Sequence, residues 1–125
     1  MTEALLVGAG GFLGAIARWA LGGWLADRTS AAFPYETFII NISGCFAIGL
    51  FMTLATDLFG WPPSVRLFVA IGFLGAYTTF STFGYESIKL IEGGGFWLAA
   101  ANATGSVLAG LAAVWAGMAL GRVFT

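Results

Sequence analysis

The sequence predicts an all-α membrane protein, because apolar residues dominate it, charged residues are scarce, and its apolar stretches match a bilayer in length. Of the 125 residues, 59% are hydrophobic and 9% are charged, whereas soluble domains carry roughly 25% charged residues. A membrane-spanning helix needs about 20 mostly apolar residues. Four such stretches with short connections use nearly the whole chain. We therefore expect residues 1–125 to form a single transmembrane domain of four helices in a lipid bilayer.

The first two predicted helices cover residues 4–26 and 37–56. The polar connection between them contains Pro34, which interrupts helices because it lacks a backbone N–H. Glycines recur in the first span, and pairs at spacing four, such as Gly10 and Gly14, let helices approach closely in lipid. This glycine string loosely resembles a dinucleotide fingerprint, but no strand precedes it. We interpret it as a helix-packing surface.

The last two predicted helices cover residues 65–91 and 96–123. The turn before the third helix contains the sequence Trp-Pro-Pro at residues 61–63, and three consecutive glycines at 93–95 separate the third helix from the fourth. Several of the five tryptophans lie near the proposed helix ends, where their amphipathic rings prefer the membrane–water interface. We assign these tryptophans mainly to anchoring.

The third span contains an unusual polar run, which reads Gly-Phe-Leu-Gly-Ala-Tyr-Thr-Thr-Phe-Ser-Thr-Phe-Gly over residues 72–84. Glycine and threonine are poorer helix formers than leucine or alanine. One interpretation is a helix interrupted at mid-membrane, whose freed carbonyls face protein, water or an ion. The other is an unbroken helix in which the hydroxyl groups bond back to preceding carbonyls. The residue types alone leave both interpretations open.

Basic residues are balanced between the two sides of the predicted membrane domain. Arg66 and Arg122 lie on the side that holds both termini, and Arg28 and Lys89 lie on the other side. Orientation in the membrane normally follows an excess of Lys and Arg in cytoplasmic loops. Because that excess is absent, we expect that the chain can insert both ways and pair as an antiparallel homodimer.

Polar residues within the membrane are costly and mark functional positions by default. Phe80 and Phe83 are three residues apart and can share a helix face. Such a pair commonly serves packing, but the ring edge carries partial positive charge and can face a small anion without binding it too tightly for release. Asn41 can add amide N–H donors, and Asn102 and Ser106 share one face at spacing four.

Composition excludes several other functions. The net charge is −1, so no basic field attracts nucleic acid. The chain has no histidine and one cysteine, which excludes a His/Cys metal cluster. Nucleophile elbows, paired carboxylates and Walker-type phosphate loops are also missing from the sequence. We therefore expect no enzymatic activity and no organic cofactor.

Three blocks of sequence carry a family resemblance. Residues 10–19 read Gly-Gly-Phe-Leu-Gly-Ala-Ile-Ala-Arg-Trp, residues 37–44 read Thr-Phe-Ile-Ile-Asn-Ile-Ser-Gly, and residues 72–83 contain the polar run. These blocks are similar to the first-helix signature, the second-helix asparagine motif and the broken third helix of the Fluc/CrcB family of small membrane fluoride channels. The resemblance covers essentially the full chain.

The resemblance implies passive fluoride conduction that lowers cytoplasmic fluoride and provides fluoride resistance. It implies an antiparallel dual-topology homodimer with two pores in the inner (plasma) membrane, and a third helix broken at the midplane. It also implies a structural sodium ion between the protomers, held by the backbone carbonyls of Gly75 and Thr78. By similarity, Arg18 and Glu86 lie at the pore mouths, and the fluoride pathway comprises Asn41, Phe80, Ser81, Thr82, Phe83, Asn102 and Ser106.

Two positions depart from the family pattern in the fourth helix. Asn102 stands where some members have tyrosine, and Gly110 stands where some have serine. Part of the family's polar track is therefore missing from this chain.

Two other functions remain as alternatives. A four-helix proton-coupled exporter of small drugs needs a carboxylate in the first span, but the only acidic residue nearby is Glu3, which precedes that span, so Glu86 would have to carry the proton. A structural membrane subunit without transport would tolerate leucine at Phe80 and Phe83.

Overall fold

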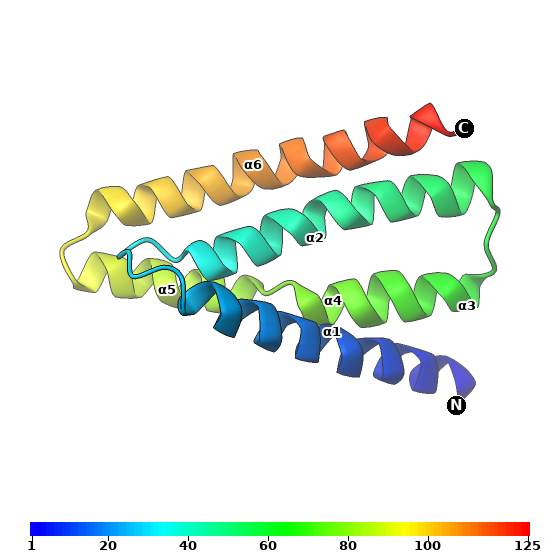
Figure 1. The fold of residues 1–125 in the computed structure, drawn as a ribbon, viewed down its shortest axis with the longest axis horizontal. Coiled ribbons are helices and arrows are strands. Elements are labelled where there is room, and N and C mark those ends of the chain that lie inside the picture. The colour runs from blue at the N-terminus through cyan, green and yellow to red at the C-terminus, as the bar shows by residue number, and fades with distance from the viewer.

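The computed structural model describes residues 1–125, which form helices and connecting turns and no strands. Four helical spans are long and apolar enough to cross a membrane: Thr2–Ala26, Tyr35–Leu58, Pro63–Glu92 and Phe96–Val123. Figure 1 shows these spans running along the long axis of the bundle, with both chain termini at the same end. The prediction of an all-α chain with four membrane-capable helices is confirmed, and the protein is a multi-pass membrane protein.

Two long helices, α1 (Thr2–Ala26) and α6 (Phe96–Val123), are single regular elements. The second span is α2 (Tyr35–Thr53), continued by the π-helical turn η1 (Leu54–Leu58). It begins and ends two residues outside the expected range 37–56. Its helix starts directly after Pro34, which is the N-cap residue, and its C-terminal end extends because π-helical hydrogen bonds continue the winding through Leu58.

The third span consists of four short elements. These are α3 (Pro63–Arg66), η2 (Leu67–Leu74), α4 (Gly75–Tyr77) and α5 (Phe80–Glu92). The span begins at Pro63 rather than at the expected residue 65, because the fixed φ of proline suits the first helical turn. Between α4 and α5 the backbone is extended: Thr78 has φ −83° and ψ 157°, and Thr79 has φ −148° and ψ 113°.

The helices pack as two close pairs, α2 with α6 and α1 with η2. Glycines make both approaches possible. A Cβ at Gly49 would meet the backbone of Val114, and one at Gly117 would meet the backbone of Phe46. Gly10 lies just as close to the Phe68 carbonyl. The interpretation of the first-span glycine string as a packing surface is confirmed at Gly10, and the same approach of backbone to backbone occurs at Gly49 and Gly117.

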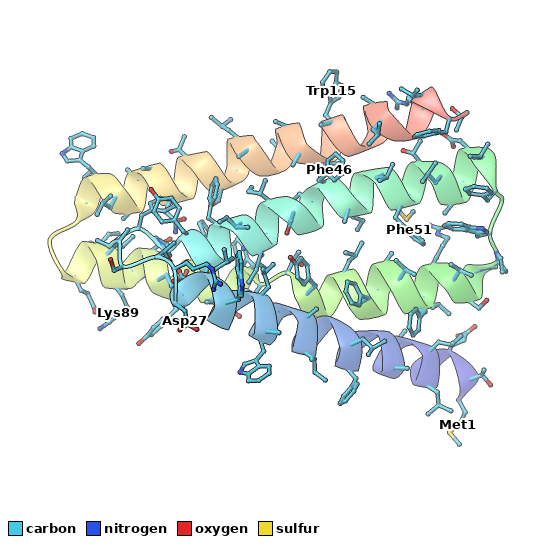
Figure 2. All side chains as sticks on the ribbon, viewed as in Figure 1. Met1, Asp27, Phe46, Phe51, Lys89 and Trp115 are labelled. Carbon is cyan, nitrogen blue, oxygen red and sulfur yellow. The ribbon has the colours of Figure 1, made fainter.

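Large apolar side chains cover much of the outer surface. Trp115 is 69% exposed, and Figure 2 shows it standing away from the bundle on α6. Buried hydrophobic residues are few, namely Leu25, Ile40, Ala55, Leu74 and Ala99. This distribution fits a lipid environment, in which acyl chains rather than a large protein interior cover apolar side chains.

Candidate functional site

The extended residues of the third span are bonded to a single side chain of α2. The Asn41 Nδ2 donates to the Thr79 carbonyl at 3.0 Å, and the Thr79 N–H donates to Asn41 Oδ1 at 2.8 Å. One amide therefore satisfies both backbone polar groups of Thr79, in the way that a neighbouring strand would. Because an unpaired backbone group is costly in lipid, this paired bond stabilises the extended conformation.

The side chain of Thr79 caps the helix that follows. Its Oγ1 accepts a hydrogen bond from the Thr82 N–H at 3.2 Å and donates to Thr82 Oγ1 at 3.0 Å. Threonine at an N-cap satisfies a backbone donor that the helix itself leaves free. Thr79 is buried, with 8% of its surface exposed. The same residue thus ends one helical segment and begins the next.

These bonds free two backbone carbonyls. In an unbroken α-helix the Thr79 N–H would donate to the Gly75 carbonyl, and the Thr82 N–H would donate to the Thr78 carbonyl. Here both N–H groups donate to side-chain oxygens instead. Gly75 and Thr78 are the residues that sequence resemblance assigned to sodium. Backbone carbonyls of unwound helix are suitable ligands for this hard cation, so the donor set fits the ion.

A groove of about 340 Å³ lies beside the extended residues. We call it the phenylalanine groove, because Phe80 and Phe83 line it with their rings 5.6 Å apart between centroids. Phe80 is 84% exposed, so the groove is open to the outside of the protomer. Its lining combines residues of α2, the third span and α6: Asn41, Gly44, Cys45, Ile48, Ala70, Leu74, Gly75, Thr78, Phe80, Phe83, Ser106 and Val107.

Six residues that the sequence nominated therefore lie together on one surface. They are Asn41, Gly75, Thr78, Phe80, Phe83 and Ser106. Close packing of Gly44 makes this possible, because a Cβ there would meet the methyl group of Thr78. The nominated pathway residues and the nominated sodium ligands are thus neighbours in the same groove.

The two nominated charged residues line a second, larger cavity of about 590 Å³. Arg18 and Glu86 face this charged cavity together with Thr82, Thr37 and Glu36, but no ion pair joins Arg18 to Glu86. Glu86 Oε1 accepts a hydrogen bond from Thr37 at 2.8 Å, whereas its Oε2 is buried without a protein partner. Thr79 and Thr82 line this cavity and not the phenylalanine groove, although their neighbours Thr78, Phe80 and Phe83 line the groove.

The remaining nominated residues have different surroundings. Ser81 is exposed, and its hydroxyl lies 3.4 Å from that of Thr79. Asn102 is only 1% exposed and does not line the groove. Its Oδ1 accepts a hydrogen bond from Ser106 at 3.3 Å, and its Nδ2 donates to Ser87 at 3.0 Å. The expectation that Asn102 and Ser106 share a helix face is confirmed.

Sequence reasoning did not assign roles to Thr37, Thr79 or Ser87. Thr79 was one hydroxyl residue among several in the polar run, and its doubled bond to Asn41 depends on a contact between two spans. Thr37 and Ser87 bond to Glu86 and Asn102. A search for hydroxyl residues near intramembrane Glu and Asn would have found both, because Ser87 follows Glu86 directly and Thr37 lies four residues before Asn41. The bond of Thr37 to Glu86 joins two spans and leaves no signal in the sequence.

Comparison with known proteins assigns the chain to a family. The family model described as CrcB-like protein, Camphor Resistance (CrcB), matches residues 5–118. A relative from Solibacter usitatus, named fluoride-specific ion channel FluC, is 49% identical over 94% of this chain and 97% of its own length. A relative of the same name from Chloroflexus aurantiacus is 45% identical over 99% of this chain and 98% of its own length. Another of that name, from Acidobacterium capsulatum, is 44% identical over 94% of this chain and 94% of its own length. The chain belongs to the CrcB family.

Proposed function

We propose that this protein is a fluoride-selective channel of the inner (plasma) membrane that conducts passively and lowers cytoplasmic fluoride. The observation that carries the proposal is the phenylalanine groove, where two phenyl rings, an amide and a hydroxyl group from three spans meet without a fully charged side chain. The names of the relatives supply the ion. In this proposal fluoride flows down its own gradient, and no enzymatic step is involved.

The groove can replace the water around fluoride in stages. Fluoride is small and strongly hydrated, so its passage requires several weak donors in succession. Asn41 has two N–H donors, and one of them bonds to Thr79, which leaves the second for the anion. The ring edges of Phe80 and Phe83 add partial positive charge. Ser106 on α6 and the hydroxyl groups of Ser81 and Thr82 extend this path.

The charged cavity is suited to be the mouth of the path. Arg18 is the one cationic side chain that attracts anions there, and it does so against the carboxylates of Glu36 and Glu86, which line the same cavity together with Thr82. Asn102 contributes from behind the groove through its bond to Ser106.

A second, oppositely oriented copy would close each groove and produce two pores. Support for this antiparallel dual-topology homodimer comes from the exposure of Phe80 and from the balance of Arg66 and Arg122 against Arg28 and Lys89. The interruption at Thr78 and Thr79 would then lie near the midplane of the membrane, where the two copies meet.

The carbonyls of Gly75 and Thr78 from both copies would hold a structural sodium ion at the centre of this dimer. When bound, the ion supplies a positive field that favours anion entry. The chain's own part is to present these carbonyls, which Asn41 and Thr79 achieve by taking up the two N–H groups that would otherwise cover them.

Ion efflux from proteoliposomes tests the proposal. Purified dimers should release fluoride rapidly down its gradient, whereas chloride efflux should remain at the level of empty vesicles. Phe80→Leu and Phe83→Leu remove the ring edges with little loss of apolar volume, so we expect fluoride efflux to collapse while dimerisation persists. Absence of fluoride efflux from verified dimers would refute the function, and normal efflux from both leucine variants would refute the role of the rings.

A further inference from the structure

A chain of three hydrogen bonds connects α6 to α5 behind the phenylalanine groove. Ser106 Oγ donates to Asn102 Oδ1 at 3.3 Å, Asn102 Nδ2 donates to Ser87 Oγ at 3.0 Å, and Ser87 Oγ donates to the carbonyl of Phe83 at 2.8 Å. Each bond is donated in the direction from Ser106 to Phe83. Ser87 has a single hydroxyl hydrogen, which it donates to Phe83, so it can only accept from Asn102. The chain begins at one residue of the groove and ends at another.

The central residue of this chain is the largest fully buried side chain of the protein. Asn102 is 1% exposed. A buried amide in a membrane helix is costly unless it is bonded, and here both ends of the amide have partners. Because the side chain does not line the groove, an ion in the groove does not touch it.

The helix that carries Phe83 depends on such contacts for its position. The extended residues Thr78 and Thr79 separate α5 from the regular winding of the preceding helix, so that winding does not determine the rotation of α5 about its axis. Thr79 bonds to Asn41 at the N-terminal end of α5. Thr37 of α2 also bonds to Glu86 of α5. The bond from Asn102 to Ser87 lies one turn beyond Phe83 and provides a further point of attachment, on α6.

We propose that Ser87 and Asn102 are positioning residues that hold α5 at the rotation which presents the Phe83 ring edge to the groove. The inference rests on the proposed function for its consequence, selective fluoride conduction, but its geometric content is independent of that function. The asparagine at position 102, where the family resemblance leads to tyrosine in some members, acts through Ser87 rather than on the ion.

Two measurements on the full-length dimer test this inference. The first incorporates 4-fluorophenylalanine at position 83 and records its ¹⁹F resonance, which reports the surroundings of the ring whether or not the channel conducts. The second measures fluoride and chloride efflux. The variants are Ser87→Ala, which removes the hydroxyl group, Ser87→Thr, which retains it, Asn102→Leu, and Thr104→Ala. Thr104 is an exposed residue of the same helix with no side-chain hydrogen bond, so it is the matched control.

We expect Ser87→Ala and Asn102→Leu to shift or split the ¹⁹F resonance, because the Phe83 ring moves. Fluoride efflux through both variants should slow about tenfold, because the displaced ring no longer faces the ion in the groove. Their selectivity for fluoride over chloride should fall as well, which a purely structural loss would not cause in the surviving dimers. Ser87→Thr and Thr104→Ala should resemble the unmodified protein. Because the residues act as one unit, the double variant should be no slower than the worse single variant.

An unchanged resonance in Ser87→Ala would overturn the inference, and so would additive losses in the double variant. If Asn102→Leu does not form dimers, Ser87→Ala alone decides the outcome. A shifted resonance together with no fluoride efflux from the unmodified protein would refute the proposed function while supporting the positioning role.

Discussion

The pair α2–α6 and the interrupted third span are stabilised by different means. In the first region glycines let backbone pack on backbone, as Gly49 does against Val114 and Gly117 against Phe46. In the second region the backbone leaves the helix, and side chains such as Asn41 and Thr79 satisfy its polar groups. The first region needs residues with small side chains and no particular hydrogen-bonding groups. The second needs particular donors and acceptors.

This difference separates stability from function in the chain. Close glycine packing provides a rigid surface, on which the positions of α2 and α6 are determined by van der Waals contact. The interruption leaves polar backbone beside a groove, which lipid-exposed backbone elsewhere in the membrane would not tolerate. Substitutions in the first region should therefore affect folding, whereas substitutions in the second should affect both folding and conduction.

The largest effect is expected for Asn41→Ala. It leaves the N–H and carbonyl groups of Thr79 unpaired, at a cost of about 1–3 kcal/mol for each group. We expect fluoride efflux to be abolished and the thermal stability of the protein to fall strongly. Asn41→Asp retains the acceptor for the Thr79 N–H but places a carboxylate oxygen against the Thr79 carbonyl within the membrane, so it should not restore the lost stability. An Asn41→Ala variant with normal efflux would show that the extended residues do not need this amide.

A smaller effect, confined to stability, is expected for Gly117→Val. The added atoms would meet the backbone of Phe46 and Leu50, and overpacking of this kind costs about 1–3 kcal/mol or more. Gly23→Ala is the matched control, because a Cβ at Gly23 has nothing within 4 Å and alanine favours helix. Denaturation in detergent should show that Gly117→Val is less stable than Gly23→Ala. The rate of fluoride efflux per folded Gly117→Val protein should stay near normal. Equal stability of the two variants would contradict the close packing.

Thr79→Ala tests the helix cap within the interrupted region. It removes the acceptor of the Thr82 N–H, for which the loss at an N-cap is about 0.5–2 kcal/mol. We expect moderately lower stability and slower fluoride efflux, and restoration of both by Thr79→Ser, which keeps the hydroxyl group. The same loss in the serine variant would mean that the methyl group, not the hydrogen bond, matters at this position.

The smallest effect is expected for Lys89→Gln. Lys89 forms an ion pair with Glu92 at 2.9 Å, and both side chains are more than half exposed. Figure 2 shows Lys89 at the end of the bundle opposite Met1. Pairs of this kind contribute about 0.2–1 kcal/mol at most. Stability and efflux of the purified, assembled protein should therefore remain within the error of the unmodified protein. A large loss of either would reveal a role beyond the ion pair, such as the balance of basic residues across the membrane.

Much of the fold could be predicted from residue types. Apolar length predicted four spans, and the predicted range 96–123 coincides with α6. Glycines at spacing four indicated close helix packing, which Gly10 provides against Phe68. The first span begins two residues before the expected residue 4, and the ends of the second and third spans differ by one or two residues. Pro34 and Pro63 mark the helix starts in the sequence, whereas the π-helical turn that extends the second span leaves little signal in composition.

The site could be predicted only as a set of residues. The polar run predicted either an interruption or an unbroken helix, and nothing within the run decides between them, because the deciding partner of Thr79 is Asn41, 38 residues earlier. Ser81, Asn102 and Ser106 were nominated as equals. Only Ser106 among them lines the groove, since α6 turns Asn102 toward Ser87.

The sequence by itself determined the membrane environment, the four spans and the family, because these depend on composition, length and local motifs. The tertiary structure decided where the helix is interrupted, which carbonyls become free and which polar side chains reach the groove. The physical reason is that a backbone group in lipid takes whichever partner lies within hydrogen-bond distance. That distance is a property of packed helices and not of any single segment.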